Sequence, residues 1–216
     1  MKIYVIRHGE TEMNVRHVKQ GWLDTPLNDA GRELARLTGL AMKGIRFDKC
    51  VSSPLVRSRE TVEIVLRESG NGDVPIETDD RLKEINFGLE ENTPATSSLL
   101  PPEIGIQFFT DSLHFPGFPG GESVRDLIRR TGEFLTELAA RNDDQTWLIG
   151  THGCALRAMM NPLYADPERF WQGCVPPNCS FAILDVKDGR PILLESDRVF
   201  YDPSLLVDHY QDIPRN

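Results

Sequence analysis

Short apolar runs alternate with longer amphipathic stretches along this chain. Runs rich in Ile, Val and other β-forming residues, bounded by turn-forming residues, are typical of strands. Six such runs are predicted to be strands: residues 3–6, 47–52, 76–78, 146–150, 179–186 and 192–196. Lys187-Asp188-Gly189-Arg190 separates the last two runs and is expected to form the turn between them.

Between these runs, apolar residues recur at the spacing of a helical face. Asn28 is expected to cap a helix whose apolar face is made of Ala30, Leu34, Leu37 and Ala41. Ser53-Pro54 fits an N-cap followed by a first helical residue, which predicts a second helix to about residue 67. Ser123 and Asp126 have the spacing of a capping box before a third helix, and a fourth is predicted over residues 154–160.

This alternation of strands and helices predicts the fold class. Parallel strands need crossover connections, and helices supply them on both faces of the sheet. The expected fold is an α/β three-layer sandwich with a mostly parallel central sheet, helices on both faces and an irregular lid insertion. We expect residues 1–216 to form a single domain.

The lid is predicted from residues 89–121, where the periodicity breaks down. This segment holds five prolines, four glycines and four of the ten phenylalanines of the chain. Long irregular connections are often lids or binding loops. The alternative is a linker between domains, but four phenylalanines require burial against something, so we expect an insertion over one end of the domain.

Composition and charge restrict the class of partner. The 216 residues contain 24 Lys and Arg against 33 Asp and Glu, a formal net charge of −9. This balance argues against binding to nucleic acid or to an anionic membrane, because both select clustered positive charge. The sequence shows no signal peptide and no apolar run of the roughly 18 residues that a membrane span needs. Four cysteines are too few for a disulfide scaffold, so we expect reduced thiols and a cytoplasmic location, with the oligomeric state left open.

Three predicted strands end in polar, small or basic residues. The endings are Arg7-His8-Gly9, Ser52-Ser53-Pro54 and Thr151-His152-Gly153. In open parallel sheets, ligands bind outside the carboxyl ends of the strands, so the two His-Gly pairs are expected to meet in one crevice. The glycine after each histidine is expected to let a ligand approach the backbone.

The residues gathered there suit a phosphate group. Arg7 and Arg57 offer planar donor forks that match phosphate oxygens, and the two helix starts nearby offer backbone amides. One histidine can act as nucleophile while the other stabilises the oxyanion. Glu84 is a candidate acid for the leaving alcohol, although its position alone does not single it out. Each signal is weak by itself: a His-Gly pair is often a plain turn, and Arg57 is equally explained by a surface pair with Glu60.

Taken together, these blocks resemble a known family. Arg7-His8-Gly9-Glu10-Thr11, with Asn14 three residues later, resembles the signature of the histidine phosphatase superfamily, the phosphoglycerate-mutase-like proteins. The resemblance continues in the same order as far as about residue 160. Its further blocks are residues 20–27 (Gln-Gly-Trp-Leu-Asp-Thr-Pro-Leu), residues 52–55 with Arg57, Glu60 and Thr61, residues 82–85 with Phe87-Gly88, residues 120–123, and residues 151–153.

The resemblance implies a role for each matching residue. It implies that His8 accepts the phosphoryl group, and that Arg7, Arg57 and His152 hold the phosphate oxygens, assisted by Asn14 and by the amides of Gly153 and Cys154. Glu84 is implied as proton donor to the leaving group and then as base for water, with Gln20 and Gly21 lining the substrate side. The resemblance implies that no metal is needed, and no compact His/Cys ligand set occurs in this sequence. We expect this chain to use no cofactor.

The chain departs from the family pattern after the Glu84 block. Many relatives have an aromatic residue and then Glu-Gly there, whereas this chain has Glu90 at the aromatic place and Asn92 at the glycine. The substrate contacts of this loop are therefore unusual. Cys154 is expected to be a small buried residue that fills space in the core. At the start of the last predicted helix, therefore, only the backbone contacts of the family are expected in this chain.

Three functions remain open at this stage. A metal-independent phosphomonoester hydrolase acting on a small phosphorylated metabolite is favoured, because residues 89–121 contain no Arg or Lys to hold a second phosphate. That segment instead contains four phenylalanines. These side chains suit a substrate whose part beyond the phosphate is apolar or neutral, unless they only form the core of the loop itself. The alternatives are a cofactor-dependent phosphoglycerate mutase and a catalytically silent phospho-ligand-binding relative.

Overall fold

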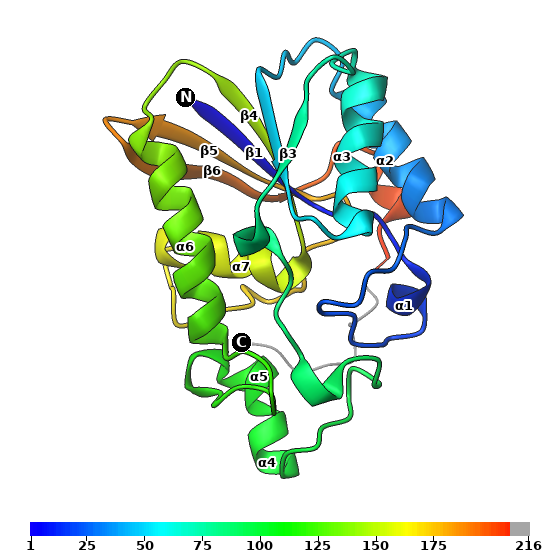
Figure 1. Ribbon diagram of the computed structural model, residues 1–216, viewed down its shortest axis with the longest axis vertical. Helices are drawn as coiled ribbons and strands as arrows, with labels where there is room; N and C mark the ends of the chain where they lie inside the picture. The colour runs from blue at the N-terminus through cyan, green and yellow to red at the C-terminus, as the bar shows by residue number, and fades with distance from the viewer. Residues whose placement is uncertain (208–216) are drawn as a thin grey trace.

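The computed structural model describes residues 1–207, and its centre is a six-stranded mixed sheet (Figure 1). The strands are β1 (Lys2–Arg7), β2 (Lys49–Ser52), β3 (Ile76–Thr78), β4 (Thr146–Thr151), β5 (Phe181–Lys187) and β6 (Arg190–Arg198). Their spatial order is β3-β2-β4-β1-β5-β6. The first four are parallel, and β5 pairs antiparallel with both β1 and β6. All six predicted strands are present and the mostly parallel sheet is confirmed.

Helices cover both faces of this sheet (Figure 1). Helices α2 (Asp29–Ala41) and α3 (Val56–Ser69) lie on one face, over a core that includes Phe47, Val65 and Phe181. Helices α6 (Val124–Ala140) and α7 (Gly153–Met160) lie on the other, over Phe134 and Trp147 among others. The three-layer α/β sandwich is therefore confirmed, because each layer buries the apolar stripe that its sequence period predicts.

Shorter helices lie in the connections and near the described C-terminal end. They are α1 (Glu12–Val15), α4 (Pro102–Gly105) and α5 (Gln107–Thr110), with the single 3₁₀ turns η1 (Asp80–Leu82), η2 (Gly88–Glu90), η3 (Ser112–His114), η4 (Asn161–Leu163) and η5 (Pro203–Leu205). The β5–β6 turn has Asp188 and Gly189 at φ +52° and +71°, the left-handed conformation of a two-residue hairpin. This confirms the predicted turn.

Two of the expected helix caps are confirmed and one is wrong. The Asn28 side chain accepts a hydrogen bond from the Gly31 amide, and Ser123 and Asp126 form a capping box. Ser53, however, does not begin α3, which starts two residues beyond Pro54 at Val56. The Val56 amide donates to the Asp24 carboxylate at 2.6 Å, so a side chain from a distant loop takes the role of the expected cap.

The 89–121 segment is an irregular insertion, as predicted. It contains α4, α5 and η3 and lies at the end of the molecule where β1 and β4 finish (Figure 1). Its four phenylalanines are buried with Val124, Trp171 and neighbouring residues in a third apolar core. They contact one another mostly edge to face, with ring centroids 4.8 to 5.6 Å apart. The insertion is thus packed on the sandwich and is not a linker.

The segment after β6 is partly packed on the same sandwich. Tyr201 is buried and its hydroxyl donates to the Asn178 carbonyl at 2.9 Å. Phe200 packs edge to face on Phe181. Leu205 and Leu206 are exposed, and Tyr210, whose packing the sequence left open, lies outside the described residues.

Candidate active site

The strand endings singled out in the sequence meet at one edge of the sheet. In the β1–β4 ladder Arg7 is opposite Thr151, and in the β2–β4 ladder Ser52 is opposite Gly150. The His8 amide donates to the Thr151 carbonyl at 3.0 Å, and the His8 and His152 rings lie 5.2 Å apart. The expected convergence of the two His-Gly pairs is therefore present.

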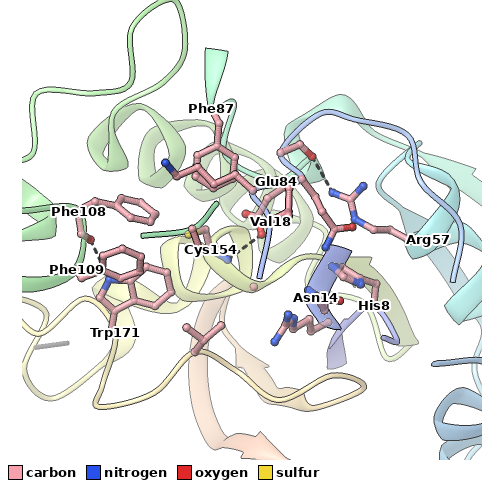
Figure 2. Close-up of a pocket in the computed structure, with 17 residues that line it drawn as sticks. His8, Asn14, Val18, Arg57, Glu84, Phe87, Phe108, Phe109, Cys154 and Trp171 are labelled. Atoms are coloured by element: carbon pink, nitrogen blue, oxygen red, sulfur yellow. Dashed lines mark hydrogen bonds between the residues drawn. The ribbon is translucent and has the colours of Figure 1, made fainter. Parts of the chain in front are cut away.

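A pocket opens at this edge, with a polar end and an aromatic end (Figure 2). In that view His8, Asn14 and Arg57 lie toward one side, Phe108, Phe109 and Trp171 toward the other, and Glu84 and Cys154 between them. The lining residues that the sequence named are Arg7, His8, Asn14, Gln20, Gly21, Arg57, Glu84, Gly153 and Cys154. The aromatic end comes from the lid and from Trp171, which the sequence analysis did not single out.

His8 is held in one tautomer. Its Nδ1 lies 2.6 Å from the Gly9 carbonyl oxygen, which only accepts hydrogen bonds, so Nδ1 carries the proton. Burial and the charges of Arg57 and Arg7 hold the pKa of His8 well below 6.5. The ring is therefore neutral near pH 7, and the lone pair is on Nε2. A neutral imidazole in this state is a competent nucleophile.

Two buried guanidinium groups flank His8. Arg57 donates from Nη1 to the Leu23 carbonyl and from Nη2 to the Gly21 carbonyl, both at 2.7 Å, and Arg7 donates to the Pro176 carbonyl. The Nε atoms of both arginines are buried without a hydrogen-bond partner among the described residues. Burial lowers the pKa of Arg57 to about 10, which still leaves it charged at neutral pH. Unpaired cationic donors in a pocket favour an anionic ligand.

His152 is held by the serine that the sequence placed at a helix start. Its Nε2 lies 2.8 Å from Ser53 Oγ, and this oxygen accepts from the Leu55 amide at 3.3 Å. A hydroxyl can donate to an imidazole nitrogen or accept from it, so this contact holds the ring in place in either tautomer. Burial, Arg57 and His8 hold the pKa of His152 well below 6.5. Nδ1 is buried and has no hydrogen-bond partner among residues 1–207.

The backbone amides at the two helix starts have different hydrogen-bond partners from those that the sequence suggested. The Glu84 carboxylate accepts hydrogen bonds from the amides of Cys154 at 3.1 Å and Ala155 at 3.0 Å, at the N-terminus of α7. The Cys154 amide, expected as a phosphate donor, thus donates to Glu84 in this structure, and its role toward a phosphate stays a prediction, as does that of the Gly153 amide. With Asp24 at the start of α3, both helix dipoles act first on carboxylates of the protein itself.

Glu84 itself is firmly positioned. Its carbonyl accepts from Trp22 Nε1 at 2.9 Å and from Arg130 Nη2 at 2.7 Å. The carboxylate lies between the histidine end and the aromatic end of the pocket (Figure 2).

Asn14, Gln20 and Gly21 also line the pocket. Asn14 Oδ1 accepts from the Thr11 amide at 3.1 Å, so its NH₂ group is the end left for a ligand. Gln20 Oε1 accepts from two threonine hydroxyls at 2.9 Å, which leaves its amide group to the pocket. Gly21 has φ +43°, and a Cβ there would lie 1.9 Å from Glu91 Oε1.

Glycine is needed after His8 for a different reason from the one expected. A Cβ on Gly9 would lie 2.6 Å from the Gly31 carbonyl oxygen, so this glycine permits close packing of the loop on α2. The expectation that it opens the backbone to a ligand is wrong. A Cβ on Gly153 would meet Arg7 and Val175 only at 3.5 Å, and Gly153 does line the pocket.

The two departures from the family pattern have local explanations. Asn92 has φ +62°, and Asn is among the few residues besides glycine that adopt this conformation readily. Glu90 is buried and its carboxylate lies 2.5 Å from Lys19 Nζ. Lys19 lines the pocket but was missed by the sequence analysis, because nothing in its local pattern indicates burial.

Two further residues of the site were also missed. Asn178 Nδ2 donates to the His8 carbonyl at 3.0 Å and so helps to fix the nucleophile loop. Glu91 accepts from the amides of Trp22 and Phe87, and burial raises its pKa. Both act on the site from loops distant in sequence, so only tertiary structure shows them.

The structure is an α/β fold with a pocket at the carboxyl edge of its sheet, lined by His8, Arg7 and Arg57. Residues 3–197 match the model of the histidine phosphatase superfamily (branch 1), and the chain belongs to this superfamily.

Curated relatives carry different names. The chain is 32% identical over 169 residues to a 2,3-bisphosphoglycerate-dependent phosphoglycerate mutase of Methylobacterium, covering 73% of this chain and 78% of the relative. It is 29% identical over 197 residues to phosphoserine phosphatase 1 of Hydrogenobacter thermophilus, covering 90% and 91%. The superfamily is thus shown, while the names divide between mutase and phosphatase.

Solved structures agree with the fold. YhfR of Bacillus stearothermophilus superposes with a TM-score of 0.83 at 30% identity, covering 92% of this chain and 97% of that one. A phosphoserine phosphatase mutant of Entamoeba histolytica, in complex with phosphoserine, superposes with a TM-score of 0.78 at 25% identity, covering 91% and 96%.

Two features are absent from the described part of the chain. No helix within residues 1–207 is both long and apolar enough to cross a membrane. In the same part of the chain, no group of three or more His, Cys, Asp or Glu side chains is arranged to hold a metal ion.

Proposed function

We propose that this protein hydrolyses small phosphomonoesters through a phosphohistidine on His8, without a metal ion or other cofactor. The observation that carries the proposal is the state of His8: a neutral ring whose Nδ1 proton is bound by the Gly9 carbonyl. Its Nε2 lone pair lies in a pocket lined by Arg7 and Arg57, whose Nε donors are unpaired. The site is therefore prepared for in-line attack on a bound phosphate.

The proposed reaction has two steps. His8 Nε2 forms a bond to phosphorus while the bond from phosphorus to the leaving oxygen breaks, and Glu84 in its acid form gives that oxygen a proton. Water then attacks the phosphohistidine, Glu84 takes the proton, and inorganic phosphate leaves with His8 restored. Arg7, Arg57 and His152 Nδ1 donate to the phosphoryl oxygens in both steps.

Hydrolysis is favoured over mutase activity by the charge of the pocket. A mutase must hold a second phosphate, and among residues 1–207 the pocket has one cation besides Arg7 and Arg57, namely Lys19. That ammonium group is paired with Glu90. The similarity to the Methylobacterium mutase keeps phosphoglycerate mutase as the second candidate. A silent phospho-ligand-binding relative is the third.

We further propose that the chain is one domain with residues 89–121 as its specificity insertion. The four cysteines form no disulfide in the structure, which supports a reducing, cytoplasmic setting. The oligomeric state is not part of the proposal.

The test uses p-nitrophenyl phosphate with and without excess EDTA, alongside His8→Ala. We expect turnover that survives chelation and falls by at least about 10³-fold in the variant, because the nucleophile is lost. A ³²P-labelled substrate quenched in alkali should label wild type but not His8→Ala. Turnover that needs metal, or that persists in the variant, contradicts the proposal. Assays with 2- and 3-phosphoglycerate separate mutase from phosphatase, and binding of phosphate without any turnover identifies the silent relative.

A further inference from the structure

A second cavity lies beside the catalytic pocket, under the lid. It has a volume of about 400 Å³, and its walls are mostly apolar side chains of the insertion, among them Leu100, Ile106 and Phe118. Four residues line both cavities: Lys19, Ala95, Phe108 and Phe109. The second cavity therefore continues the aromatic end of the pocket, on the side where the leaving group of a substrate would extend.

The cations that line the two cavities are not equally free to bind a leaving group. Among the described residues that line them, the cations are Arg7, Arg57 and Lys19. The two arginines belong to the phosphate end with His8. A carboxylate or second phosphate on the leaving group could therefore be recognised only by Lys19.

Lys19 is buried and paired within the protein. Its Nζ lies 2.5 Å from Glu90 Oε2, with side-chain exposures of 5% and 1%. The same ammonium group donates to the Ser97 carbonyl and lies 5.6 Å from the centroid of the Phe118 ring. Two of its three N–H donors are thus used in hydrogen bonds, and its charge is balanced by the Glu90 carboxylate.

Glu90 is held in its charged form by its surroundings. Its Oε1 accepts from the Ser98 hydroxyl and from the Leu99 amide, both at 2.8 Å. Burial alone raises the pKa of a carboxyl group, but the hydrogen bonds from Lys19, Leu99 and Ser98 lower the pKa of Glu90 below its ordinary value. The buried pair is consequently an ion pair with no net charge.

We propose that Glu90 is a specificity-determining residue: by neutralising Lys19 it makes the site prefer phosphomonoesters with an uncharged, apolar leaving group that extends into the second cavity. Leaving groups that carry a carboxylate or a second phosphate find no free cation and are disfavoured. This inference rests on the proposed phosphatase function of the same site. It separates this chain from the relatives named for phosphoserine and phosphoglycerate.

The test compares two substrates that differ by one carboxylate on the leaving group. Phenyl phosphate and 4-carboxyphenyl phosphate are assayed on the same preparation, and the ratio of their kcat/KM values is recorded. The fraction of folded enzyme cancels in this ratio, so a merely structural role of the pair leaves it unchanged. For wild type we expect the ratio to favour phenyl phosphate by about tenfold or more, the effect of one missing charged hydrogen bond.

Three variants test the ratio. The two single variants should move it in opposite directions, and the double variant should leave it nearly unchanged. Glu90→Gln removes the negative charge that neutralises Lys19, so the ammonium group keeps its net positive charge whichever end of the amide faces it, and the ratio should shift about tenfold toward the carboxylate substrate. Lys19→Met leaves Glu90 unpaired beside the leaving group, and the ratio should shift further toward phenyl phosphate. The double variant Lys19→Met/Glu90→Met removes both charges and should keep the ratio within about threefold of wild type. Glu33→Gln, which breaks an exposed ion pair with Arg36 on α2, is the matched control and should leave the ratio unchanged.

The second cavity is tested with a longer neutral substrate. 4-Butylphenyl phosphate should be hydrolysed at least about threefold more efficiently than phenyl phosphate, since each buried methylene adds favourable transfer free energy. The inference is overturned if wild type uses both phenyl substrates equally, or if the ratio fails to move in opposite directions in the two single variants. If Glu90→Gln does not fold, Lys19→Met and the double variant still decide. Hydrolysis of phenyl phosphate through His8 with no charge preference overturns this inference alone, whereas absence of all turnover overturns the proposed function as well.

Discussion

At the residue scale, the Ser53 hydroxyl holds the His152 ring through Nε2. It contacts Nε2 at 2.8 Å while accepting from the Leu55 amide, and Nδ1 is the ring nitrogen without a partner among the described residues. Ser53→Ala should lower kcat/KM for p-nitrophenyl phosphate by about tenfold or more, because a buried ring nitrogen loses its partner and the ring its fixed orientation. The thermal midpoint should change much less than the activity.

Ser58→Ala is the matched control for this prediction. Ser58 belongs to the same buried hydroxyl cluster, with its Oγ 3.0 Å from that of Ser52, and no hydrogen bond joins it to His152. Its kcat/KM should stay near that of wild type. Equal losses in the two variants would show that Ser53 acts through packing and not through the imidazole.

Single residues also show how much of the site could be predicted from the sequence. His8, His152 and Arg57 were predicted to meet because each follows a strand or begins a helix in a recognisable local pattern. Lys19 and Asn178 were not predicted, since their partners lie 71 and 170 residues away in sequence. Local pattern identifies a residue whose neighbours in sequence explain it, and it misses one whose partner comes from another loop.

At the element scale, the helix starts show which features are determined by the local sequence and which by tertiary contacts. The start of α6 was predicted because Ser123 and Asp126 satisfy each other within one turn. The start of α3 was placed two residues early, because its cap is Asp24, which lies 32 residues before Val56. The amides of α7 were expected to hold phosphate, yet the Glu84 carboxylate takes two of them.

The capping box of α6 allows a stability prediction. Ser123 Oγ accepts from the Asp126 amide at 3.2 Å, so Ser123→Ala leaves a helix N–H without its partner. The free energy of unfolding should fall by about 1 kcal/mol. Urea unfolding followed by circular dichroism measures this loss. Thr136→Ala, at an exposed position of the same helix, should not destabilise the protein, and an unchanged Ser123→Ala would show that the cap contributes nothing.

At the scale of the whole molecule, a net charge of −9 surrounds a small site that gathers two arginines and two buried histidines. Desolvation by the folded chain, together with Arg57, holds the pKa values of His8 and His152 well below 6.5. The unfolded chain restores both to about 6.5. Below that pH the unfolded state therefore binds more protons than the native state, and folding loses stability as the pH falls.

This difference in proton binding predicts a pH-dependent stability. Two histidines that protonate only on unfolding give a slope of about 2.7 kcal/mol per pH unit below about pH 6, and almost no slope above pH 7.5. Urea unfolding between pH 5 and 8 measures it. His8→Asn/His152→Asn should flatten the profile over this range, whereas His114→Gln, which changes an exposed histidine paired with Asp111, should not. A profile equally steep in the double variant would contradict the assignment to these two histidines, because carboxylates with lowered pKa values, such as Asp79 and Glu90, lose their contribution only below about pH 4, outside the measured range.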